Sequence, residues 1–387
     1  MALIRSNRSR DLRVDFFRGL ALWWIYTDHI PGDVLGRFSL QNFALCDAAE
    51  VFVLLAGFGA GIAYGSVMDR QGYLYAAADT LRRAWTLYIA HIFLFVVYSA
   101  QVAYSAAALD RMFYLDEARL NVLADDPFRG LLEALLLRFQ PNLLNILPLY
   151  VVLLLIFALA LPLLRKPMLL FSVSATLYVA ARFTGLNLPS WDDNGGWFLN
   201  PFAWQFLFII GAILAYAPPQ MPRVRWPFDL LSVAVLLTGV VIIWVIDNHP
   251  HILGALPPQL VRLVISEDKT GLHPLRLLSI VSLTWLAVRT IPRGALWLES
   301  RYAAPLVLLG QNSLPVFCSG IFFGFIARLG LEADDGASMQ LAVNVLGAVA
   351  MLAVGGLAAW YRGKGRAPAP AARQTVTLPA AARTDTG

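Results

Sequence analysis

Ten apolar stretches, separated by short polar segments, run through the whole sequence. Each is about long enough for a helix of roughly 20 residues to cross the hydrocarbon core of a bilayer. The pattern therefore predicts an all-α fold, a polytopic transmembrane helical bundle of about ten spans that forms one domain over residues 1–361. The expected spans are residues 16–34, 44–66, 85–108, 143–164, 167–184, 200–217, 228–246, 275–291, 303–327 and 338–361.

The polar segments predict how the bundle is oriented. Alternate segments, beginning with the N-terminal one, hold 20 of the chain's 30 Lys and Arg residues. Such residues gather on the cytoplasmic side of membrane proteins, so we expect both termini to be cytoplasmic. Residues 109–141 combine mixed charge with helical spacing, which indicates an interfacial helix pair or a cap over the bundle. Residues 362–387, rich in Ala, Pro and Thr, indicate a disordered cytoplasmic tail.

Composition strengthens the membrane assignment. Hydrophobic residues make up 58% of the chain and charged residues only 14%, unlike an ordinary soluble domain. The net charge of +5 is explained by the cytoplasmic segments, so no nucleic-acid partner is expected. Cys46 and Cys318 are the two cysteines, which predicts neither a disulfide framework nor a Cys/His metal site.

The first span carries ionisable side chains at both ends. Arg18 and His29 are eleven helical steps apart, which places them about 16 Å apart along the axis and on nearly the same face. Asp15 either pairs with Arg18 or, like it, extends to interfacial water. His29 and the adjacent Asp28 lie deeper, where ionisable groups usually face a functional cavity. We therefore expect His29 to be catalytic, with Asp28 in support.

Two carboxylates begin the second span at the end of the bundle where His29 lies. Asp47 and Glu50 are three residues apart and share a helix face, so they could orient the imidazole of His29 and raise its basicity. Alternatively, Asp47 is the N-cap of the helix and Glu50 completes a capping box. Close helix packing is expected at the four following glycines: Gly57, Gly59, Gly61 and Gly65.

Further polar residues indicate a polar interior. Arg82 and Arg83 precede the third span and could hold phosphates, although they could also be cytoplasmic anchors. The Asn residues could equally join helices by hydrogen bonds. The remaining candidates for substrate contact are His91 within the third span, Asn142, Asn145 and Asn312 in or beside later spans, and an outer cluster of Glu267, Asp268, Lys269 and His273.

Two segments, "RVDFFRGLALWWIYTDHIP" and "NFALCDAAEVFVLLAGFGAGIAYG", resemble the start of the OpgC family of membrane-bound glucan succinyltransferases. The segments "QPNLLNILPLYVVLLL", "DKTGLHPLRLLSI" and "LVLLGQNSLPVFC" are similar to its later parts, so the resemblance covers about residues 10–325. The related acyltransferase-3 group has an Arg, ten residues and a catalytic His in its first span, matched here by Arg18 and His29. That group also has two arginines separated by two residues, whereas Arg82 and Arg83 are adjacent.

The resemblance implies a bacterial inner-membrane enzyme that transfers an acyl group, typically succinyl, from cytosolic acyl-CoA to hydroxyls of periplasmic glucans, without a bound cofactor. Donor phosphates are expected near Arg82 and Arg83. His29 would deprotonate the acceptor or carry the acyl group itself. The expected acceptor contacts are Asp47, Glu50, Asp268, Lys269 and His273. Two alternatives remain: a transporter or flippase of an anionic metabolite, and an acyltransferase acting on a lipid-linked sugar or surface polysaccharide.

Overall fold

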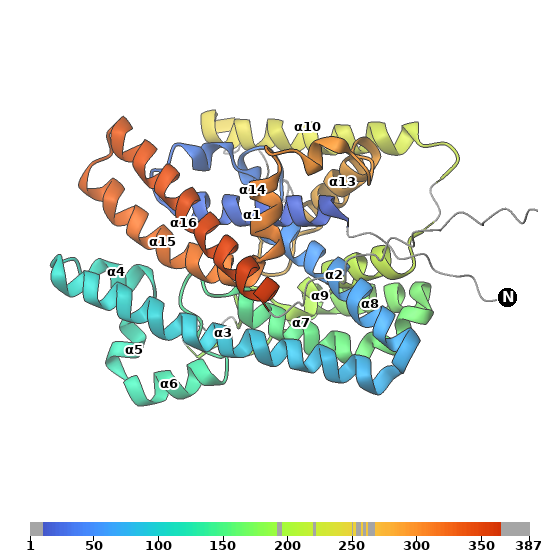
Figure 1. Cartoon of the computed structure of the whole chain (residues 1–387), viewed down its shortest axis with the longest axis horizontal. Helices are drawn as coiled ribbons and strands as arrows, with labels where there is room; N and C mark the ends of the chain where they lie inside the picture. Colours follow the sequence, from blue (N-terminus) through green and yellow to red (C-terminus); the bar gives the residue numbers. More distant parts are fainter. Residues whose placement is uncertain are drawn as a thin grey trace, which may run out of the picture.

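The computed structural model describes residues 11–191, 196–219, 222–249, 251–252, 257, 261 and 268–364. Within these residues the chain forms helices and no strand. Figure 1 shows α1 near the middle of the bundle, α10 along one edge and α3 along the other. The helices are α1 (Leu12–Asp28), η1 (Leu35–Phe38), η2 (Leu40–Asn42), α2 (Ala48–Gln71), α3 (Tyr73–Ala108), α4 (Phe113–Glu117), α5 (Asn121–Asp125), α6 (Pro127–Leu135), α7 (Ile146–Ala160), η3 (Leu161–Arg165), α8 (Pro167–Thr184), α9 (Pro201–Tyr216), α10 (Trp226–Asn248), α13 (Pro274–Thr290), η4 (Leu296–Glu299), α14 (Ala304–Gln311), α15 (Ser313–Ala333) and α16 (Ala337–Lys364).

Each of the ten predicted apolar stretches contains a helix, which confirms the all-α class. Among the described residues, seven helices are long and apolar enough to cross a membrane: α2, α3, α7 with η3, α8, α10, α15 and α16. Helices α1, α9 and α13 have only 17, 16 and 17 residues. The count of about ten crossings and the placement of the termini therefore stay predictions. The predicted tail beyond Lys364 lies outside the described residues.

The stretch 303–327, predicted as one span, is broken at Asn312 into α14 and α15. Pro315 lies three residues after the break. Its ring replaces the N–H that would bond the carbonyl of Gln311, and it clashes with that carbonyl in a continuous helix. The break therefore has a local cause in the sequence.

Glycine lets two helix pairs touch backbone to backbone. Between α2 and α9, a Cβ on Gly57 would lie 2.0 Å from the carbonyl oxygen of Phe208, and one on Gly211 would lie 2.2 Å from that of Leu54. Between α1 and α14, a Cβ on Gly19 would lie 1.9 Å from the carbonyl oxygen of Leu306. No side chain fits at these points, so the expectation of close packing is confirmed for Gly57.

Residues 109–141, predicted as a helix pair or a cap, form the three short helices α4, α5 and α6 beside one end of α3 (Figure 1). Arg328 and Glu332 on α15 hold this cap in place. Arg328 pairs with Glu117 at 2.5 Å, and Arg111 pairs with Glu332 at 2.9 Å. The chain then leads through residues 138–145 into α7, along a cavity described below.

The helix contacts give a direct test of the packing. Gly57→Ala would force α2 and α9 apart, because the carbonyl of Phe208 is main chain and cannot rotate away. We expect this overpacking to cost about 1–3 kcal/mol, measured as a lower midpoint of thermal unfolding in detergent. Gly356→Ala in α16 is the control, because nothing lies within 4 Å of its added Cβ. An unchanged midpoint for Gly57→Ala would contradict the close contact.

Candidate active site

Two cavities lie one after the other along the bundle, and α1, α2 and α7 line both. We call them the His29 cavity, of about 400 Å³, and the Arg18 cavity, of about 150 Å³. Helix α1 contributes Arg18 near its start and His29 at its end. Helix α2 runs the opposite way, from Asp47 at the His29 cavity to Ala63 at the Arg18 cavity. Arg18 and His29 therefore line two separate cavities of one bundle.

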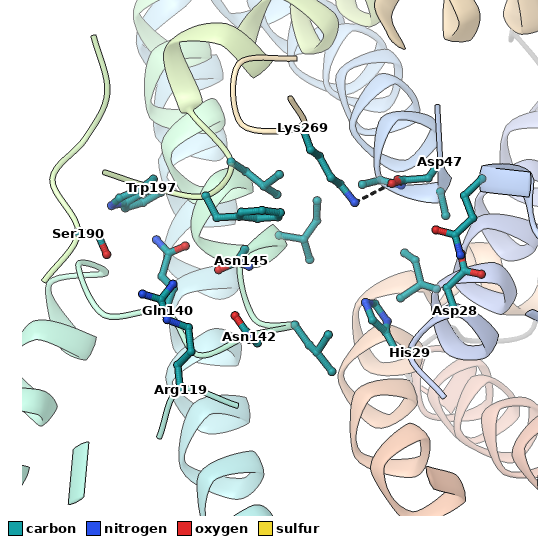
Figure 2. Close-up of a pocket in the computed structure, with 18 of the residues that line it drawn as sticks. Asp28, His29, Asp47, Arg119, Gln140, Asn142, Asn145, Ser190, Trp197 and Lys269 are labelled. Carbon is teal, nitrogen blue, oxygen red and sulfur yellow. Dashed lines mark hydrogen bonds and ion pairs between the residues drawn. The ribbon is translucent and has the colours of Figure 1, made fainter. Parts of the chain in front are cut away.

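The imidazole of His29 follows the last residue of α1, at the C-cap. Figure 2 shows it on one side of the cavity, with Gln140, Asn142 and Asn145 on the other. Nδ1 of His29 and Oδ1 of Asp28 are buried and have no hydrogen-bond partner among the described residues. Asp28 lines the cavity beside His29, but no hydrogen bond joins the two in this part of the chain.

The capping-box alternative for the start of α2 is confirmed. The backbone N–H of Ala49 donates to Oδ1 of Asp47 at 2.7 Å, and the N–H of Asp47 donates to Oε2 of Glu50 at 2.9 Å. These bonds satisfy N–H groups that a helix start leaves unpaired. Glu50 is fully buried and does not line the His29 cavity, so the structure does not place it against His29.

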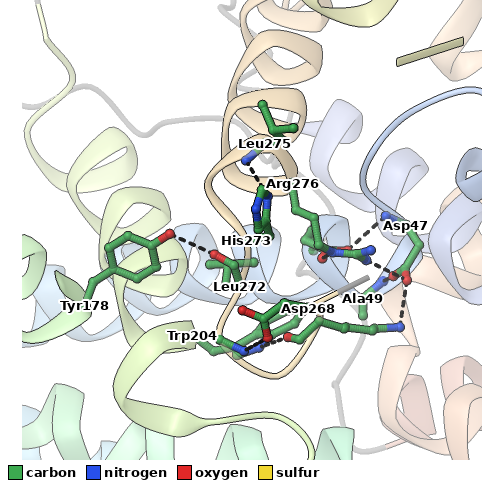
Figure 3. A network of polar contacts seen from close by, with 12 residues as sticks. Asp47, Ala49, Tyr178, Trp204, Asp268, Leu272, His273, Leu275 and Arg276 are labelled. Carbon is green, nitrogen blue, oxygen red and sulfur yellow. Dashed lines mark hydrogen bonds and ion pairs between the residues drawn. The ribbon is translucent and has the colours of Figure 1, made fainter. Parts of the chain in front are cut away.

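Arg276 on α13 binds both of these carboxylates. Its Nε lies 2.6 Å from Oε1 of Glu50, and a terminal nitrogen lies 2.9 Å from Oδ2 of Asp47. Lys269 reaches the same Asp47 oxygen at 2.6 Å (Figure 2), and Figure 3 shows Arg276 beside Asp47. Burial raises the pKa of the Asp47 carboxyl, but the charges of Lys269 and Arg276 outweigh it and hold that pKa below its usual value. Sequence analysis did not select Arg276. A lone Arg at the predicted outer end of an apolar span departs from the positive-inside pattern, and this departure was the signal that could have identified it.

The loop before α13 brings one of the three described members of the predicted outer cluster to the cavity. Lys269 lines it, and the carbonyl of Lys269 accepts a hydrogen bond from the indole of Trp204 at 3.0 Å. Asp268 instead pairs with Arg182 on α8 at 2.9 Å. His273 caps α13, its Nδ1 accepting from the N–H of Leu275 at 3.2 Å.

Neither Asp268 nor His273 lines the His29 cavity, so their contact with the acceptor stays a prediction. Burial lowers the pKa of His273, and the nearby charge of Arg182 lowers it further. Glu267 lies outside the described residues.

Of the predicted arginines Arg82 and Arg83, one lines the Arg18 cavity. Arg83 lines this cavity, with Tyr64 and Tyr150, whereas Arg82 is exposed and does not. The second guanidinium at this cavity is that of Arg18, which donates to the carbonyl of Leu55 at 3.0 Å. The two cations therefore come from α1 and α3, not from adjacent positions in the sequence.

Three other predicted residues lie away from both cavities. Asp15 is buried and accepts a hydrogen bond from Gln311 at 3.3 Å. Asn312 accepts one from Arg362 on α16 at 2.5 Å. His91 is buried on α3, and neither ring nitrogen has a hydrogen-bond partner among the described residues.

Asn142 and Asn145 do line the His29 cavity, as Figure 2 shows. Residues that sequence reasoning did not select also line it, because three separate loops bring them there: Gln41, Arg119, Gln140, Ser190, Trp197 and Phe198.

Comparison with known proteins adds one match. The sequence model of the family described as OpgC protein matches residues 10–363, nearly the whole chain. No curated protein and no solved structure matches the chain.

The ion pairs at the start of α2 predict a stability effect. Arg276→Gln would leave two buried carboxylates without their shared cation. Removing one partner of a buried pair costs about 3–5 kcal/mol, so we expect a clearly lower midpoint of thermal unfolding. Adding Glu50→Gln to this variant should restore part of the loss, because one uncompensated charge disappears. Arg289→Gln is the control, since Arg289 pairs with Asp229 at a more exposed site. Equal midpoints for the Arg276 and Arg289 variants would contradict the stabilising role of the ion pairs that Arg276 makes.

Proposed function

We propose that this chain, which belongs to the OpgC family, is a membrane-bound O-acyltransferase that moves a succinyl group from cytosolic succinyl-CoA to hydroxyls of periplasmic glucans. Family membership itself suggests a glucan-modifying acyltransferase. The succinyl group, the CoA donor, the inner-membrane location and the direction of transfer belong to the proposal. The observation that supports it most is the pair of cavities, one lined by two arginines and the other by an imidazole.

The Arg18 cavity suits the donor. Guanidinium groups bind carboxylates and phosphates through parallel N–H donors, and acyl-CoA carries both kinds of group when the acyl chain is a dicarboxylic one. Arg18 and Arg83 face this cavity from different helices. In the predicted orientation, the cavity lies toward the cytoplasm, where acyl-CoA is found. The His29 cavity would then lie toward the periplasm and receive the acceptor.

His29 has the chemistry that the transfer requires. As the acceptor hydroxyl oxygen attacks the thioester carbonyl, the imidazole takes its proton. The tetrahedral intermediate then expels the CoA sulfur, which receives that proton, leaving an ester and free CoA. In the second route, the neutral imidazole of His29 attacks the thioester and expels the CoA sulfur, which takes the ring N–H proton. The acceptor hydroxyl then attacks the acyl-imidazole, and its proton returns to the imidazole as the ester forms.

Acylation itself is tested with the purified protein in vesicles that hold acyl-CoA on one side and glucan on the other. Mass spectrometry of the glucan should show an added acyl group for the wild-type protein. His29→Ala should lower the rate by at least about 100-fold, because general acid–base catalysis contributes about that much or more. His251→Ala is the matched control, since His251 is exposed and lines neither cavity. Wild-type acylation by His29→Ala would refute the assignment, and anion flux without acylated glucan would favour the transporter alternative.

Donor binding is tested separately. Arg18→Gln and Arg83→Gln should each raise the KM for acyl-CoA by roughly 10- to 100-fold, because each removes a hydrogen-bonding charge. The KM for glucan should stay constant. Arg82→Gln should change neither value, since Arg82 is exposed outside the cavity. Equal effects of Arg82→Gln and Arg83→Gln on the KM for acyl-CoA would contradict the placement of the donor.

A further inference from the structure

Two charged residues that line the His29 cavity, Asp47 and Lys269, are bound to each other. Asp47, which faces the cavity, accepts hydrogen bonds from Lys269 at 2.6 Å and Arg276 at 2.9 Å. It also accepts from the N–H of Ala49, so both of its carboxylate oxygens are engaged. A ligand that used Asp47 or Lys269 for binding would have to compete with these pairs. The expected recognition of the acceptor by the charged cluster is therefore disfavoured.

The amide side chains on the same cavity are in the opposite situation. Asn145 occupies the N-cap of α7, where Asn usually bonds a backbone N–H of the first turn, yet it makes no such bond. Gln41, which is exposed and lines the cavity, also makes no side-chain hydrogen bond within the described residues. Each amide has two donor hydrogens and one acceptor oxygen to offer a ligand.

Two more amides continue this surface. Gln140 uses its nitrogen to bond the carbonyl of Leu137, and Asn142 bonds the carbonyl of Glu117. Their oxygens make no bond within the described residues. Between Asn142 and Asn145 lies Leu143, which lines the cavity and has a positive φ of 74°. Such a conformation is costly for Leu and is retained mainly where function requires it. Figure 2 shows Gln140, Asn142 and Asn145 together, across the cavity from His29.

Two aromatic rings complete the lining. Trp197 is only 4% exposed, and its indole N–H has no acceptor among the described residues. Phe198 is half exposed, beside it in the chain. Flat aromatic rings offer an apolar surface for the C–H face of a pyranose, and neighbouring amides can bond its hydroxyls. A cavity of about 400 Å³ has room for a sugar ring.

We infer that Gln41, Gln140, Asn142, Asn145 and Phe198 form a binding site for a neutral sugar unit of the acceptor. The amides hold its hydroxyls, and the half-exposed ring of Phe198 supports its apolar face. One hydroxyl is thereby presented to His29 across the cavity. The inference rests on the proposed function for the identity of the acceptor, but it assigns the recognition to uncharged groups. The Arg18 cavity differs from this uncharged site, because two guanidinium groups line it.

Steady-state kinetics with Asn145→Ala and Gln41→Ala test this site. Each variant should raise the KM for glucan by roughly 2- to 10-fold, the effect of losing one neutral hydrogen bond, while the KM for acyl-CoA stays constant. Asn145→Ala removes no helix cap, because the side chain makes no cap bond. Asn248→Ala is the matched control, since Asn248 is exposed at the end of α10 and lines neither cavity. An unchanged KM for glucan in both variants, or a raised KM for acyl-CoA instead, would overturn the inference.

Binding without the donor separates this inference from the proposed function. A short neutral gluco-oligosaccharide should quench or shift the tryptophan fluorescence of the wild-type protein in nanodiscs, and bind more weakly to Asn145→Ala. A matched oligosaccharide that ends in a glucuronate should bind no better than the neutral one. If the wild-type protein binds the sugar but transfers no acyl group, the proposed function fails while the sugar site stands. If it acylates glucan while the amide variants bind the neutral sugar as the wild-type protein does, only the sugar site fails.

Discussion

The buried charge of Arg276 sets the position of the helix on which both cavities depend. It neutralises Asp47 and Glu50 at the start of α2, where a capping box already organises the same two carboxylates. Because a buried charge is tolerated only when paired, α2, α13 and the loop that carries Lys269 have one arrangement in which all the charges are satisfied. In that arrangement both carboxylates are bound to protein groups, whereas the side chains of Asn145 and Gln41 make no hydrogen bond within the described residues.

The two cavities follow from how the helices run. Helix α1 leads from one cavity to the other, α2 leads back, and α7 borders both near its start. Residues that lie close in the sequence are thereby separated, as with Arg82 and Arg83. Residues that lie far apart are joined, as with Arg18 and Arg83. A bundle built in this way places two guanidinium groups at one cavity and an imidazole at the other.

Hydropathy and helix spacing were enough to predict where the helices lie, that Asp47 and Glu50 could form a capping box, and that Arg18 and His29 sit at opposite ends of one helix. Those features depend on neighbours a few residues away. The partners of Arg276, the exclusion of Asp268 and His273 from the cavity, and the arrival of Gln41, Gln140 and Trp197 depend on contacts between distant segments. Spacing along the chain carries no information about which loops meet, so these could not be predicted.

The glycine contacts also bear on how an acyl group would travel. At Gly19 and Gly57, α1 and α2 touch the backbones of α14 and α9 with no side chain between them. Rocking either helix would separate surfaces that have no flexible side chains with which to refill the gap. Under the proposed function, the distance of about 16 Å between the levels of Arg18 and His29 is then covered by the extended arm of the donor. Under that proposal, the protein would be a fixed frame through which the donor reaches the acceptor.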